Sequence, residues 1–135
     1  MIEYKRENDL SAGEFRDVLV RSTLGERRPI DDPGAIESML RHANLIITAR
    51  DNKRLVGVAR SLTDFAFCTY LSDLCVDEEY QKKGIGKQLI RETKTAAPDG
   101  KLLLLAAPKA IHYYGKIGMI KFDQCFTLEN ESQLK

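Results

Sequence analysis

The sequence predicts one mixed α/β domain whose strands and helices follow in the order β-α-α-β-β-β-α-β-α-β. Amphipathic stretches with helical periodicity are separated by short apolar or alternating stretches that are typical of strands. Clusters of Gly, Pro, Asp and Asn mark the boundaries between them. A chain of 135 residues is long enough for one sizeable core. We therefore expect a single domain over residues 1–135.

The N-terminal part is predicted to place two helices between strands. Ser11 precedes Glu14 by three residues, which is the spacing of a capping box ahead of the first helix. Asp32 offers an N-cap to the second helix, with Pro33 at the first helical position. Short links between the strands that follow favour antiparallel hairpins. In chain order we expect a strand over 2–6, helices over about 12–22 and 33–42, and strands over 45–49, 55–62 and 68–76.

The C-terminal part is predicted to alternate helix and strand. A helix begins near Gly84 and ends before Pro98, and a continuous leucine run over 102–105 is typical of a strand covered on both faces. Pro108 begins a further helix that carries Ile111, Tyr114 and Ile117. Residues 122–128 are predicted to form the last strand, and an exposed edge at that strand favours a homodimer.

Charge and cysteine content narrow the classes of partner. With 21 Lys and Arg against 20 Asp and Glu, the formal net charge is +1, so no global field recruits nucleic acid or an anionic membrane. No apolar run approaches the roughly 20 residues that span a bilayer. The three cysteines cannot all pair, and no secretory signal begins the chain, which indicates a cytoplasmic protein with reduced thiols. His42 and His112 lack partners at metal-binding spacing, so we expect no metal.

A glycine-containing loop between the predicted strand 68–76 and the following helix carries the main functional signal. Its glycines let the backbone approach a ligand closely, and the first free N–H groups of the helix point toward an anion. Three lysines add positive charge. The loop therefore predicts a pyrophosphate cradle made of Gln81, Lys82, Lys83, Gly84, Ile85, Gly86 and Lys87.

Two well-known phosphate loops do not match this stretch. A P-loop requires Gly where Gln81 stands and a hydroxyl residue where Gln88 stands. A Rossmann fingerprint requires a third Gly at the position of Leu89 and an acidic residue about 20 residues later at the end of a second strand. ATP bound by a P-loop and a dinucleotide are both disfavoured.

The pattern Gln-x-x-Gly-x-Gly resembles the signature loop of the GNAT superfamily of acyl-CoA-dependent N-acetyltransferases. Residues 70–80 resemble the strand and turn that lead into that loop, and residues 110–119 resemble the family's later Ala-x-x-Phe-Tyr-Glu-Lys-x-Gly-Phe segment. The resemblance covers about residues 44–126, and the first 43 residues agree by element order. Two positions depart from the family pattern: Ala107 replaces an Asn that often contacts the cofactor, and Met119 replaces a Phe.

The resemblance implies the GNAT fold, a mostly antiparallel sheet splayed between its fourth and fifth strands and flanked by about four helices. It implies acetyl-CoA as co-substrate, no metal, and direct attack of a primary amine on the thioester. The pantetheine would lie against the backbone of Leu74, Cys75 and Val76. A backbone N–H around Cys75 or Val76 would stabilise the thioester oxyanion.

Tyr114 and Asp73 are the first candidates for the proton-transfer groups. Tyr114, also a cofactor contact, matches the position of the family's general acid, and a phenol is protonated at pH 7. The alternative is a core tyrosine. Tyr113 and Tyr114 project about 100° apart on a helix, so only one of them can face the cofactor slot. Asp73 is the first candidate for the general base, because an acidic residue in an apolar strand is either used or paired. Its alternative is a salt-bridged structural role. Asp64, in a turn, is the weaker candidate.

Several interpretations stay open. Cys75 invites a covalent acetyl-enzyme, but a Cys on an apolar strand is more often a buried apolar residue. Arg27 and Arg28 lie on a loop that borders the acceptor site in the resembled family. They either bind an anionic group of the acceptor or are solvated. The acceptor is a small-molecule or peptide amine. The alternatives are a non-catalytic acyl-CoA-binding module and an acetyltransferase toxin acting on aminoacyl-tRNA, which the near-neutral charge disfavours.

Overall fold

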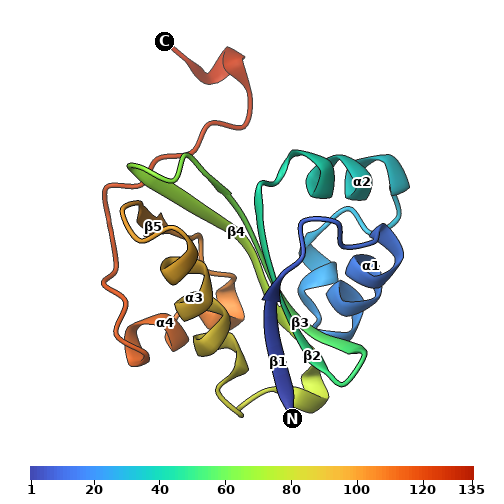
Figure 1. The fold of residues 1–135 in the computed structure, drawn as a ribbon. Coiled ribbons are helices and arrows are strands. Elements are labelled where there is room, and N and C mark those ends of the chain that lie inside the picture. Colours follow the sequence, from blue (N-terminus) through green and yellow to red (C-terminus); the bar gives the residue numbers. More distant parts are fainter. The chain divides into compact units, whose positions relative to one another are not determined.

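The computed structural model describes all residues, 1–135, as two compact units (Figure 1). The first unit comprises Met1–Leu105 and the second Ala106–Lys135.

The first unit is built on a five-stranded sheet in the order β1-β2-β3-β4-β5. Strands β2, β3 and β4 pair antiparallel, as their short links predict; β1 also pairs antiparallel to β2, and β5 pairs parallel to β4. The three strands β1, β3 and β4 begin and end within one residue of their predicted bounds. The strands are β1 Ile2–Arg6, β2 Leu45–Asp51, β3 Arg54–Thr63, β4 Cys68–Val76 and β5 Lys101–Leu103.

Helices cover both faces of this sheet (Figure 1). Helices α1 (Ala12–Arg21) and α2 (Pro33–His42) pack on one face around Phe15, Leu19 and Ile36. Helix α3 (Ile85–Ala96) packs on the other face through Ile85 and Leu89. The predicted N-caps are confirmed, because Ser11 accepts the N–H of Glu14 and Asp32 accepts the N–H of Ala35.

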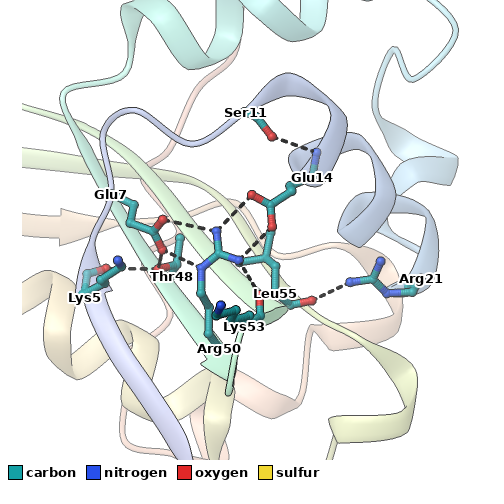
Figure 2. Close-up of polar contacts among 9 residues, drawn as sticks. All are labelled: Lys5, Glu7, Ser11, Glu14, Arg21, Thr48, Arg50, Lys53 and Leu55. Carbon is teal, nitrogen blue, oxygen red and sulfur yellow. Dashed lines mark hydrogen bonds and ion pairs between the residues drawn. The ribbon is translucent and has the colours of Figure 1, made fainter.

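A charged network joins the start of α1 to the first two strands (Figure 2). Arg50 on β2 donates to Glu7 at 2.9 Å and to Glu14 at 2.7 Å, and Thr48 also donates to Glu7. The Glu14 side chain thus bonds Arg50 instead of completing a capping box with Ser11. These carboxylates hold the pKa of Arg50 above its ordinary value.

The sheet is splayed between β4 and β5, as expected. Parallel pairing is limited to Cys68–Tyr70 against Lys101–Leu103. Beyond Tyr70, β4 pairs with β3 only, so its other backbone edge is open as far as Val76. The β3–β4 register shifts between Arg60 and Ser61, whose partners are Asp73 and Leu71. Ser72 is therefore a β-bulge in the middle of the open stretch.

The second unit differs most from the predicted elements. Its helical part is a 3₁₀ turn (Pro108–Ala110) followed by the single-turn helix α4 (Tyr113–Lys116). Residues 122–128 form no strand, so that prediction was wrong. An alternating apolar stretch forms a stable strand only when it pairs with another, and Phe126 is 92% exposed. The edge on which the homodimer prediction rested is consequently not formed.

The leucine run 102–105 also differs from its prediction of a strand covered on both faces. Strand β5 ends at Leu103, and Leu103 and Leu105 remain 45% and 54% exposed. Leu102 and Leu104 pack against the core on the α3 face. The run is thus partly buried on one face and exposed on the other.

Candidate functional site

The open edge of β4 presents the backbone groups of Leu74 and Val76. The N–H of Asp77 donates to the carbonyl of Val56 on β3 at 2.8 Å. Backbone groups of successive residues alternate between the two edges of a strand, so those of Cys75 face β3 and those of Leu74 and Val76 face the open edge. The Val76 carbonyl accordingly accepts a hydrogen bond from Gln81 Nε2 at 2.8 Å. Of the two predicted oxyanion donors, Val76 has a suitable orientation and Cys75 does not.

The glycine loop leads directly from this edge to the N-terminus of α3. Gly84 is the N-cap of α3 with φ +84°, and Lys82 has φ +64°. A Cβ at Gly84 would meet nothing within 4 Å, so the backbone conformation and not space favours glycine there. Lys82, Lys83 and Lys87 are exposed, while Gly86 is in the first turn of α3. Residues 81–87 thus form a positively charged turn with free helix N–H groups, which suits an anion.

Asp77 anchors the turn between β4 and the glycine loop. Its side chain is 3% exposed and accepts hydrogen bonds from Arg21 at 2.7 Å and Arg54 at 3.1 Å. It also accepts the N–H of Glu79 at 3.0 Å. Burial alone would raise the pKa of Asp77, but the Glu79 N–H and the Arg21 guanidinium outweigh it and hold the pKa below its ordinary value. Asp77 therefore orders the turn between β4 and the glycine loop.

Asp73 lies on the α1–α2 face of the sheet and is fully buried. Arg28, from the loop before α2, donates to one of its carboxylate oxygens, and Arg60, on β3, donates to the other. A general base needs an accessible oxygen within hydrogen-bond reach of the reacting amine. The arrangement does not fit the base predicted from the sequence and matches the salt-bridged alternative. Arg28 is correspondingly a paired residue, whereas Arg27 is exposed.

Cys75 is buried on the same face. Burial, reinforced by the negative charge of Asp73, raises the pKa of its thiol to about 12. The nucleophilic form of cysteine is the thiolate, so this environment opposes covalent catalysis. The structure agrees with a small apolar role for Cys75.

Tyr114 belongs to α4 in the second unit. Its ring forms an edge-to-face pair with that of Tyr113, with centroids 5.3 Å apart. Burial, followed by the neighbouring Tyr113, raises the pKa of Tyr114, so its phenol is protonated at neutral pH.

Asp64 has the turn role expected of it. Its Oδ1 accepts the N–H groups of Phe67, Ala66 and Cys68, and these hydrogen bonds lower its pKa to about 2.

Two partners of Asp73 were not predicted from the sequence. Arg60 and Ser72 surround Asp73, with Arg60 Nη2 donating to Ser72 Oγ at 3.0 Å. Arg60 interrupts an apolar strand just as Asp73 does. Two opposite charges in neighbouring apolar strands are the sequence signal that could have predicted their contact.

No three His, Cys, Asp or Glu side chains come together in a group that could hold a metal. None of the helices has the length and apolar character needed to cross a membrane.

The sequence profile of the acetyltransferase (GNAT) family matches residues 12–119. Over 71 residues the chain is 35% identical to a histone acetyltransferase, TAP1, from Glycine max, a match covering 50% of this chain and 31% of that protein. The chain spans from 28% to 53% of the length of the curated relatives it matches.

Solved structures share the fold at low sequence identity. A GNAT family acetyltransferase from Streptococcus pneumoniae superposes with a TM-score of 0.72 at 20% identity, covering 96% of each chain. The aminoglycoside N-acetyltransferase AAC(6′)-Iy in complex with CoA superposes with a TM-score of 0.73 at 14% identity, covering 97% of this chain and 95% of that one.

Proposed function

The chain belongs to the GNAT family of acetyltransferases, and we propose that it transfers an acetyl group from acetyl-CoA to a primary amine by direct attack within a ternary complex. The observation that carries this proposal is the open backbone edge of β4, which continues directly into the charged turn at the N-terminus of α3. The edge and the turn together match the two ends of one elongated ligand: amide groups along a strand and a pyrophosphate at its end.

Acetyl-CoA binding would use the residues predicted for it except Cys75, whose backbone groups face β3. The pyrophosphate would lie at residues 81–87, held by helix N–H groups and lysine charge. The pantetheine amides would pair with the Leu74 carbonyl and with the backbone of Val76, whose groups face the open edge, which leaves the Leu74 N–H for the thioester carbonyl. A related fold in complex with CoA supports this assignment.

Direct attack is favoured over a covalent acetyl-enzyme because Cys75 is a buried, protonated thiol. The oxyanion of the tetrahedral intermediate would be stabilised by a backbone N–H on the open edge. We propose Tyr114 as the acid that protonates the leaving thiolate, because its phenol keeps its proton at neutral pH. Asp73 is fully engaged, so the proton of the acceptor ammonium would leave through water.

The acceptor class remains a small-molecule or peptide amine. The names of two similar proteins point to a histone and to an aminoglycoside as acceptors of those proteins. Both present primary amines, so a lysine peptide and an aminoglycoside belong in the first acceptor panel.

We propose a cytoplasmic location, because all three cysteines are free, which fits a reducing compartment.

Calorimetric titration with acetyl-CoA tests the proposal, with CoA, ATP and NAD as parallel ligands. We expect acetyl-CoA and CoA to bind and ATP and NAD not to bind. Gly86→Glu should abolish this binding by placing a carboxylate in the first turn of α3. Gly13→Glu is the matched control, because Gly13 is exposed in the first turn of α1 and its Cβ would meet nothing within 4 Å.

Two outcomes would contradict the proposal. Absent binding of acetyl-CoA, or preference for ATP or NAD, would refute the cofactor assignment. Binding without CoA release in the presence of any primary amine of the panel would instead favour a non-catalytic acyl-CoA-binding module.

A further inference from the structure

A buried cluster lies directly behind the open edge of β4. We call Arg28, Arg60, Ser72 and Asp73 the Asp73 cluster. The side chains of Asp73, Arg60 and Arg28 are 0%, 7% and 23% exposed. Burying these charges costs free energy that their mutual attraction offsets only with good geometry and further hydrogen bonds. Such a cluster is weak evidence for stability and calls for another role.

The hydrogen bonds of the cluster converge on the β-bulge. Arg28 Nη2 donates to the carbonyl of Ser72 at 2.9 Å, and Arg60 Nη2 donates to its Oγ at 3.0 Å. The two guanidinium groups also hold both oxygens of Asp73, the next residue. The bulged residue has no partner in the β3–β4 register, so side chains supply the constraint that a ladder partner would otherwise give.

The peptide group that follows the cluster carries a second N–H on the open edge, in addition to that of Val76. The N–H of Leu74 belongs to the peptide bond between Asp73 and Leu74, and it faces the open edge. A preorganised N–H donor stabilises an oxyanion only when its direction is fixed before the reaction. Holding residues 72 and 73 from both sides fixes that direction.

We propose that the Asp73 cluster is a positioning device that aims the Leu74 N–H at the thioester carbonyl of bound acetyl-CoA. This inference rests on the proposed function. Asp73 and Arg28 are positioning residues and touch no substrate. Arg28 comes from the loop between α1 and α2, so the cluster also ties that loop to the oxyanion donor.

The ratio of the affinities for acetyl-CoA and CoA isolates this role, because only acetyl-CoA carries the thioester carbonyl. In calorimetric titrations Asp73→Asn should lower the preference for acetyl-CoA over CoA by roughly 3- to 10-fold, the equivalent of one hydrogen bond. Affinity for CoA itself should stay unchanged. The carbonyl stretching frequency of isotope-labelled acetyl-CoA should rise in the same complex, because a weaker hydrogen bond polarises the carbonyl less.

Glu7→Gln is the matched control. Like Asp73, Glu7 is a mostly buried carboxylate that accepts a hydrogen bond from an arginine, here Arg50 at 2.9 Å. It follows β1 and bonds to β2, away from the open edge of β4. This variant should lose stability without changing the affinity ratio. Arg28→Gln, on a loop and partly exposed, serves as the second variant if Asp73→Asn does not fold, and it should shift the ratio in the same direction.

The outcomes separate this inference from the proposed function. An unchanged ratio and an unchanged carbonyl frequency in both Asp73→Asn and Arg28→Gln would overturn the inference while leaving the proposed function intact. Equal affinity of the unaltered protein for the two ligands would also overturn it. Failure of the unaltered protein to bind acetyl-CoA would refute both.

Discussion

Cys75 lies beside the open edge of β4, and its environment predicts that it forms no acetyl-enzyme. Its side chain is buried, and its thiol pKa is raised to about 12. At pH 7 a thiol with that pKa is ionised in on the order of one molecule in 10⁵. Since the thiolate is the nucleophile, a covalent route through Cys75 would begin from this small population.

Cys75→Ala tests this reasoning. The variant should turn over amine about as fast as the unaltered protein and lose about 1 kcal/mol of unfolding free energy, the cost of a small void in the core. Urea denaturation measures the second quantity. In the unaltered protein, thiol reagents should modify the exposed Cys68 and Cys125 quickly and Cys75 only on unfolding.

Mass spectrometry of protein incubated with acetyl-CoA alone gives the decisive result. We expect no acetyl group on the peptide that contains Cys75. Cys68→Ala is the matched control, because Cys68 is an exposed thiol on the same strand and any chemical acetylation should occur there first. An acetyl group that appears on Cys75 without acceptor, and is removed when an amine is added, would refute direct attack.

Two further predictions follow from the turn and from the second unit. Asp77→Asn should cost about 2 kcal/mol at pH 7, because it removes a charged acceptor from Arg21 and Arg54. The folded pKa of Asp77 is lowered, so its contribution to stability is present above about pH 4 and is lost as the pH falls further. Urea denaturation at a series of pH values should therefore show the stabilities of the variant and the unaltered protein converging at low pH. A stability difference that does not depend on pH would contradict this. Tyr114→Phe should lower turnover by roughly 100-fold or more with little change in acetyl-CoA affinity; unchanged turnover on the true acceptor would remove Tyr114 as the acid.

Local sequence determined most of the elements of the first unit. Ser11 and Asp32 begin helices because their side chains satisfy free N–H groups a few residues later, an interaction that needs no tertiary partner. The glycine loop could also be predicted from the sequence, because the left-handed backbone conformation at Gly84 is a local requirement that glycine meets. Residues 122–128 show the limit of such reasoning, because their apolar pattern suits a strand but a strand also needs a partner.

Only the tertiary structure decided how Asp73 is paired and which edge of β4 the Leu74 N–H faces. The sequence marked Asp73 as used or paired, and the choice depended on Arg28, which is 45 positions away, and on Arg60 across the β3–β4 register. The bulge at Ser72 and the orientation of the Leu74 N–H depend on the same register. These features arise from pairing between distant segments, which periodicity and spacing do not encode. Caps, turns and glycine conformations depend on neighbouring residues and can therefore be predicted from the sequence.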